Sequence, residues 1–167
     1  LMACATAAMR TAENGSDLCK KIKKKTGIAI EIIDGKQEAR FLFRNRHKIM
    51  EAGEKAALFI DVGGGSTEMT LFHGGRISES RSFNIGTLRL LNHQVDPGGW
   101  QDMRSWIKSI SKGFASVEAI GSGGNINKLF KLSKEKTGKP VSVKKLRDVY
   151  ARLSYLSVEE RIEEYRL

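Results

Sequence analysis

The sequence is organised around the segment Ala57-Leu58-Phe59-Ile60-Asp61-Val62-Gly63-Gly64-Gly65-Ser66-Thr67-Glu68-Met69-Thr70-Leu71-Phe72. An apolar run stops at one carboxylate, three glycines and two hydroxyls follow, and a second carboxylate opens another apolar-rich run. This order predicts a buried strand, a tight glycine turn and a second strand.

The turn has the composition of a phosphate site. Successive glycine N–H groups can converge on an anion, and glycine adopts positive φ at little cost. Asp61 and Glu68 cannot face phosphate directly at neutral pH, so a divalent cation, a water or a donor has to lie between them. Mg²⁺ is the expected ion, because it prefers a few carboxylate oxygens plus phosphate oxygens. A plain hairpin turn with an aspartate at its base has the same pattern, since glycines mark turns more often than phosphate sites.

Length and composition indicate one domain, or one domain plus a piece of another. The chain has 167 residues, 40% hydrophobic and 29% charged, with a net charge of +10. This charge favours anionic partners such as nucleic acid, phosphorylated metabolites or polyphosphate, although lysine-rich outer helix faces produce it too. Cys4 and Cys19 lack metal-ligand spacing, which fits a reduced cytoplasmic compartment. No run approaches the roughly 18 apolar residues of a membrane span, so no membrane association is expected.

Before the central segment, the pattern predicts strands over residues 1–6 and 28–33. A helix is predicted over 11–25, interrupted near Asn14-Gly15 and stopped by Thr26-Gly27, and a second helix from Lys36 to about Met50. Five lysines between positions 20 and 25 are interpreted as a solvated helix face. Nucleic-acid binding is not expected, because aromatic residues are only 7% of the chain and none alternates with these lysines.

After it, residues 57–84 predict a three-stranded antiparallel meander, followed by helices over 87–94 and 100–114. A strand over 117–120 then runs into Gly121-Ser122-Gly123-Gly124-Asn125, which opens a helix over 126–134. This second glycine loop places backbone donors and a helix N-terminus where an anion is stabilised. It matches neither a Walker loop nor a dinucleotide fingerprint, and a purely structural loop has the same composition. Ser142 is expected to cap a helix over 143–153, and the last helix begins with the capping-box spacing of Ser157 and Glu160.

Three motifs carry a more specific signal. They are Ala5-Thr6-Ala7-Ala8-Met9-Arg10 with Asn14-Gly15, then Ile32-Ile33-Asp34-Gly35-Lys36-Gln37-Glu38-Ala39-Arg40, and then Phe59-Ile60-Asp61-Val62-Gly63-Gly64-Gly65-Ser66-Thr67-Glu68. In this order and approximate spacing they resemble the exopolyphosphatase and guanosine pentaphosphate phosphohydrolase (Ppx/GppA) family of the actin-like ATPase superfamily. The resemblance implies an α/β, RNase-H-like fold with a mixed sheet flanked by helices. It implies that residues 1–48 end a first such domain, that residues 49–167 form most of a second, and that the chain is truncated at both ends.

The resemblance also implies an activity: metal-dependent release of the terminal phosphate from inorganic polyphosphate or pppGpp. Glu38 matches the family's catalytic glutamate, which activates the attacking water. Asp61 and Glu68 match acidic positions that act in catalysis and hold Mg²⁺ or another divalent cation. The positions that match phosphate-binding residues are Arg10, Gly63, Gly64, Gly65, Ser66, Thr67, Gly123, Gly124 and Asn125. Arg10 also fits a structural salt bridge.

The sequence departs from the family pattern at three points. Gln37 replaces an acidic residue, Ala7 replaces a serine, and no counterpart of the family's first phosphate loop precedes Thr6. The chain by itself is therefore expected to be inactive. Incomplete sheets leave unpaired strand edges, so a homodimer formed through such an edge is a further expectation.

Two alternatives stay open from the sequence. An actin-like ATPase or kinase would require a nucleoside pocket, which these loops do not define. A catalytically dead chain would instead serve as a polyanion-binding or oligomerisation module. Phosphate release from polyphosphate without nucleotide separates the first alternative from the hydrolase.

Overall fold

The structure is a computed structural model that describes residues 2–35, 37–38, 41 and 56–166. It divides into two compact units, Leu1–Ser122 and Gly123–Leu167, which are described separately. Most of the helix predicted from Lys36 to about Met50 lies outside the described residues. So does the predicted domain boundary after residue 48.

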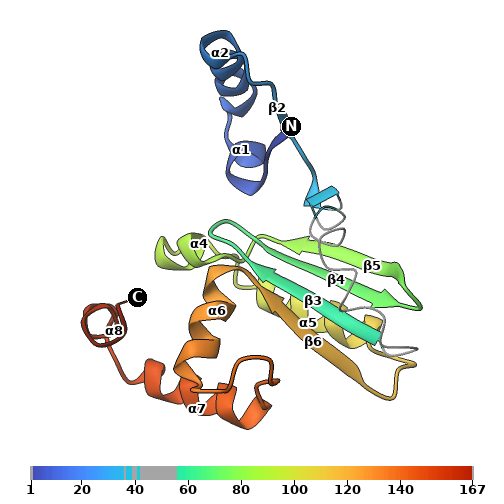
Figure 1. Ribbon diagram of the computed structural model, residues 1–167, viewed down its shortest axis with the longest axis vertical. Helices are drawn as coiled ribbons and strands as arrows, with labels where there is room; N and C mark the ends of the chain where they lie inside the picture. Colours follow the sequence, from blue (N-terminus) through green and yellow to red (C-terminus); the bar gives the residue numbers. More distant parts are fainter. Residues whose placement is uncertain (1, 36, 39–40, 42–55, 167) are drawn as a thin grey trace. The chain divides into compact units, whose positions relative to one another are not determined.

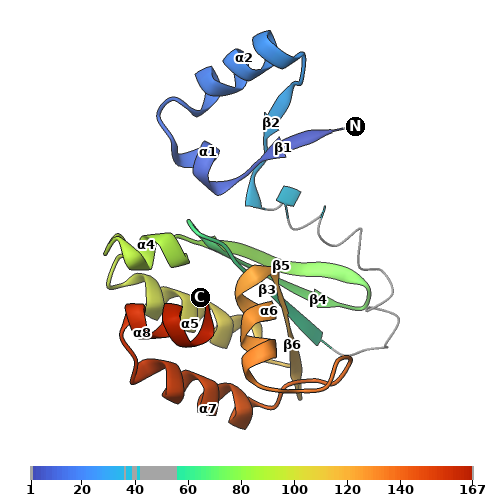
Figure 2. The ribbon, with the colours of Figure 1, turned by 60° about the vertical axis from the view of Figure 1, so that its left-hand side comes forward.

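The N-terminal segment consists of two short parallel strands, which pair with each other, and two helices (Figures 1 and 2). Strand β1 (Ala3–Ala5) pairs with β2 (Ile30–Ile32), and between them lie α1 (Ala7–Thr11) and α2 (Gly15–Thr26). The predicted strands, the interruption near Asn14 and the stop at Gly27 are confirmed. Gly27 has a φ of 76°, and its N–H donates to Lys23 O, which closes the helix in the left-handed conformation that favours glycine. The first helix begins earlier than predicted, at Ala7.

A four-stranded mixed sheet follows, with the order β5-β4-β3-β6 (Figure 1). Strands β3 (Ala56–Val62), β4 (Thr67–His73) and β5 (Arg76–Phe83) form the predicted antiparallel meander. Strand β6 (Val117–Ser122) lies parallel to β3, because a helical crossover returns the chain to the start of the sheet. The predicted α/β class, with a mixed sheet flanked by helices, is confirmed.

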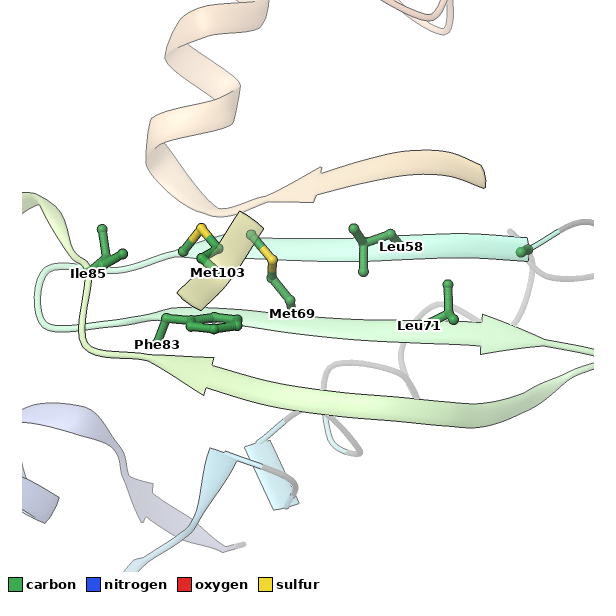
Figure 3. Packing of buried hydrophobic residues seen from close by; sticks show 7 residues of the cluster. Leu58, Met69, Leu71, Phe83, Ile85 and Met103 are labelled. Atoms are coloured by element: carbon green, nitrogen blue, oxygen red, sulfur yellow. The ribbon is translucent and has the colours of Figure 1, made fainter. Parts of the chain in front are cut away.

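The core of the first unit lies between one face of this sheet and α5 (Gly99–Ile110) (Figure 3). Alternate residues of the strands point to this face, as a half-buried sheet requires, and α5 contributes residues at helical spacing. The buried members are Ala56, Leu58, Met69, Leu71, Phe83, Ile85 and Met103. The short helix α4 (Thr87–Leu91) precedes α5 and ends earlier than the predicted helix over 87–94.

Over its described residues, 123–166, the second unit contains the helices α6 (Gly123–Leu132), α7 (Val143–Ser154) and α8 (Val158–Tyr165). Ser142 caps α7 by accepting from Lys145 N, and Ser157 and Glu160 form the predicted capping box of α8. Helix α6 begins at Gly123 rather than Ile126, so three of the predicted loop residues form its first turn. No helix among the described residues is long and apolar enough to cross a membrane.

Candidate active site

Two carboxylates face each other across the central strands. Asp61 of β3 and Glu68 of β4 are directly paired in the antiparallel register, so their side chains share one face of the sheet. This face is opposite the one that packs on α5, since Leu58 and Leu71 alternate with them. Like charges in directly opposite positions repel, so this pair needs compensating donors or cations.

Hydroxyl groups supply part of that compensation. Ser122 Oγ, at the end of β6, donates to Asp61 Oδ2 over 2.8 Å. Glu68 Oε1 accepts from Ser66 Oγ over 2.6 Å and from Ser82 Oγ of β5 over 3.0 Å. The parallel pairing of β3 with β6 brings Ser122 opposite Asp61. The site is therefore built where the carboxyl ends of these two parallel strands meet the start of β4.

Arg10 and Glu38 extend this charged group. The guanidinium of Arg10 lies 3.7 Å from Glu38 Oε2 and 3.8 Å from Glu68 Oε1, and it donates to Ile33 O at the end of β2. Both ion pairs are longer than hydrogen bonds. Glu38 Oε2 is buried and has no hydrogen-bond partner among the described residues. A buried acceptor without a donor is costly, so this oxygen is a natural position for a bound water.

The surroundings of Glu38 raise the pKa of its carboxyl group above the ordinary value of 4.5. Burial is the largest cause, and the negative charge of Glu68 is the second. Arg10 acts in the opposite direction, and Asp61 makes a smaller contribution that raises the pKa further. A carboxylate whose pKa moves toward neutrality is a better proton acceptor from water.

The glycine turn between β3 and β4 presents backbone donors. The carbonyl of Gly63 accepts from Thr87 N over 3.0 Å, and that of Gly64 accepts from Leu88 N over 2.9 Å. The N–H of Gly63 closes the turn on Ser66 O. Within the described part of the chain, the N–H groups of Gly64, Gly65 and Ser66 have no acceptor. Gly64 and Gly65 are partly exposed, whereas Ser66 is buried, with 5% of its surface exposed.

The expected positive φ in this turn is wrong: none of Gly63, Gly64 and Gly65 has one. The position that has no room for a side chain is Gly86, against the backbone of the turn, whereas Gly64 faces only the end of the exposed Leu88 side chain, which can shift. A Cβ on Gly64 would lie 2.9 Å from Leu88 Cδ1, and one on Gly86 would lie 2.4 Å from Gly64 O.

The hydroxyls of Ser66 and Thr67 are engaged within the protein. Ser66 Oγ donates to Glu68, and the buried Thr67 donates to Ile85 O over 2.6 Å. The donors left in the turn for a phosphate are therefore backbone N–H groups. Gly123, Gly124 and Asn125 lie in the second unit, in the first turn of α6, and their part in phosphate binding stays a prediction.

Three contributors to this site were not predicted from the sequence, Ser82, Gly86 and Arg89, and Ser122 was predicted only as part of the second glycine loop. The strand register places Ser82 and Ser122 beside the two carboxylates, so a correct pairing of the predicted strands would have indicated both. Gly86 stands just before a predicted helix. The sequence around it does not indicate that the backbone of residue 64 packs against it. Arg89 Nε donates to Gly65 O over 2.7 Å, and a single arginine within a predicted helix gives no local signal of such a contact.

Asp61 and Glu68 fit a Mg²⁺ site in which the protein supplies only two carboxylate ligands and water and substrate phosphate supply the rest. Among the described residues, no group of three or more His, Cys, Asp or Glu side chains is arranged to hold a metal ion. Mg²⁺ usually takes one or two protein carboxylates and completes its shell with waters and substrate phosphate. Asp61 and Glu68, side by side on one face, provide that number.

Comparisons with known proteins agree with this arrangement. The Ppx/GppA phosphatase family model matches residues 1–104. Exopolyphosphatase 1 of Mycobacterium tuberculosis strain H37Rv is 30% identical over 112 residues, which cover 64% of this chain and 33% of that protein. Exopolyphosphatase 1 of Mycobacterium leprae is 29% identical over 128 residues, or 74% of this chain and 38% of that protein. The chain thus spans about a third of the length of the curated relatives it matches.

Solved structures share the fold. An exopolyphosphatase from Cytophaga hutchinsonii matches with a TM-score of 0.77 and 23% identity, over 96% of this chain and 59% of that one. The Ppx/GppA family member of Aquifex aeolicus matches with a TM-score of 0.69 and 23% identity, over 99% of this chain and 58% of that one. The fold class and the family resemblance predicted from the sequence are confirmed. The chain belongs to the Ppx/GppA phosphatase family.

Proposed function

We propose that this chain forms part of a metal-dependent hydrolase that releases the terminal phosphate of inorganic polyphosphate or pppGpp. The observation that carries the proposal is Glu38 Oε2, a buried oxygen without a hydrogen-bond partner among the described residues, on a carboxyl group whose pKa is raised. Arg10 links this carboxylate to Glu68, and Ser66 links Glu68 to the glycine turn. A proton acceptor and a set of anion donors thus belong to one connected group.

The reaction divides between these residues. Glu38 holds a water at Oε2 and accepts its proton as the water oxygen bonds to the terminal phosphorus. The bond from phosphorus to the bridging oxygen breaks, which releases orthophosphate and leaves the chain one phosphate shorter. The N–H groups of Gly64, Gly65 and Ser66 stabilise the charge on the non-bridging oxygens. A bound Mg²⁺, held by Asp61 and Glu68, would supply further positive charge to those oxygens.

The substrate class follows from charge and from relatives. Two matched proteins are named exopolyphosphatases, and the family name includes the guanosine pentaphosphate enzymes. The net charge of +10 favours a long polyanion, because a basic surface raises its local concentration. Polyphosphate is therefore the preferred substrate in this proposal, with pppGpp second.

Phosphate-release kinetics of the native-length protein test the proposal. Polyphosphate and pppGpp are each supplied with and without Mg²⁺, and no nucleotide is added to the polyphosphate reaction. We expect Mg²⁺-dependent release that Glu38→Gln abolishes while substrate affinity is kept. Glu79→Gln, which removes an exposed carboxylate on β5, is the matched control and should leave turnover unchanged. Normal turnover by Glu38→Gln, or no release by the unaltered protein on either substrate, would contradict the proposal.

A further inference from the structure

Residues of helix α4 donate hydrogen bonds to the carbonyl groups of the glycine turn. Thr87 N and Leu88 N donate to the carbonyls of Gly63 and Gly64, and Arg89 N makes a longer bond of 3.2 Å to Gly64 O. The third carbonyl, that of Gly65, accepts from the side chain of Arg89, whose Nε lies 2.7 Å away. Three successive carbonyls are thus bound by three successive residues of α4.

This arrangement fixes the direction of the N–H groups. In a planar trans peptide, the C=O and the N–H of the next residue point in opposite directions. Because the carbonyls of Gly63 and Gly64 face the backbone of α4, the N–H groups of Gly64 and Gly65 point away from it. The carbonyl of Gly65 faces the Arg89 guanidinium, so the N–H of Ser66 points away from that group. The Gly65–Ser66 peptide differs from the other two, since a side chain rather than the backbone of α4 orients it.

The charge of Arg89 adds to this effect. A cation bound to a carbonyl polarises the peptide and strengthens its N–H as a donor. Arg89 is half-buried, and no carboxylate in the described ranges forms a salt bridge with it. Its field is therefore not cancelled locally, in contrast to that of Arg10, which lies between two carboxylates.

We propose that Arg89 is a positioning residue for phosphate binding: its Nε–H bond to Gly65 O aims the Ser66 N–H at the bound anion. The residue lies on the carbonyl side of the peptide, so it acts through the turn and does not touch the phosphate. This inference deepens the proposed function and rests on it for the identity of the anion.

Affinity for inorganic tripolyphosphate tests the inference independently of turnover. The native-length protein is titrated with tripolyphosphate by calorimetry in the presence of Mg²⁺, with every variant made in a Glu38→Gln background so that hydrolysis does not interfere. One well-aimed hydrogen bond to an anion is worth roughly a factor of ten or more in affinity, and we expect Arg89→Ala to lose about that much. Arg89→Lys keeps the charge without the guanidinium geometry and should lose less. Arg104→Ala, an exposed arginine of α5, is the matched control and should bind normally.

Chemical rescue separates positioning from folding. Ethylguanidinium should restore tripolyphosphate affinity to Arg89→Ala, whereas ethylammonium should not, because only the planar group reproduces the Nε–H bond. Equal affinity of Arg89→Ala and Arg104→Ala, loss without guanidinium rescue, or no binding by Glu38→Gln alone would overturn the inference. Failure of the proposed function gives a different result, namely no phosphate release by the unaltered protein even though Arg89→Ala weakens tripolyphosphate binding.

Discussion

Gly86→Ala should disable the site without placing a new group in it. Gly86 has an extended backbone, with φ −149° and ψ 163°, which alanine adopts freely, so the effect comes from contact alone. The added Cβ would lie 2.4 Å from Gly64 O and 2.6 Å from Ser66 N. Because carbon contacts are favourable only at about 3.5–4.0 Å, the glycine turn has to move by about 1 Å. Overpacking of this kind costs about 1–3 kcal/mol of folding free energy.

The same movement of the glycine turn should reduce the rate of phosphate release more than it reduces the folding free energy. A 1 Å displacement breaks the bonds from α4 to Gly63 and Gly64, and misplacing reacting groups by this distance costs about 100-fold in rate. Urea unfolding and phosphate release by the native-length protein measure the two effects. Gly99→Ala is the control, because its Cβ would meet Ile85 at an ordinary 3.6 Å; it begins α5, where alanine stabilises by up to about 1 kcal/mol. Normal stability and normal phosphate release in Gly86→Ala would refute the reasoning.

Three further outcomes are expected. Glu38→Gln should stabilise the folded protein at pH 7–8 and lose that advantage near pH 4, as thermal melting across pH would show. The pKa of Glu38 is higher in the folded state than in the unfolded state, so the unfolded protein releases this proton first as pH rises. The stability contributed by Glu38 therefore falls as pH rises from 4.5 through the folded pKa. A stability difference between Glu38→Gln and the unaltered protein that stays constant at all pH values would contradict this. Ser122→Ala removes the donor to Asp61 and should raise the Mg²⁺ concentration for half-maximal phosphate release about tenfold; an unchanged requirement would argue against Asp61 as a metal ligand. Ser157→Ala breaks the capping box of α8 and should cost about 1 kcal/mol in urea unfolding, and an unaltered midpoint would show that α8 unfolds independently of the measured transition.

The sequence predicts the sheet well because its signals are local and agree with one another. Apolar runs, a glycine turn and a hairpin turn at positions 73–76 are enough to define β3, β4 and β5. Capping by Ser142, Ser157 and Glu160 is equally local, since each partner lies within three residues. Helix lengths are less accurate, as α4 and α5 show, because tertiary packing decides where a helix ends.

The candidate site is predicted only in part. Glycines, aspartate and glutamate have recognisable chemistry, so the sequence predicts the central residues, but the positive φ expected at the glycines was wrong. The structure shows instead that the glycine without room for a Cβ is Gly86, which packs against the backbone of the turn. Long-range contacts also escape a reading of local patterns: Arg89 binds Gly65 across 24 positions, and Ser122 binds Asp61 across 61.

The parallel pairing of β3 with β6 has a consequence for biosynthesis. Asp61 leaves the ribosome 61 residues ahead of the serine that orients it, an interval of about 3–12 s at ordinary translation speeds of roughly 5–20 residues per second. During that time a nascent chain can pair β3, β4 and β5. The edge of β3 that later pairs with β6 stays open, and Asp61 lacks the hydrogen bond from Ser122. The hydrogen bond between Ser122 and Asp61 therefore forms late in synthesis, and slow codons between the two positions would prolong the interval before it forms.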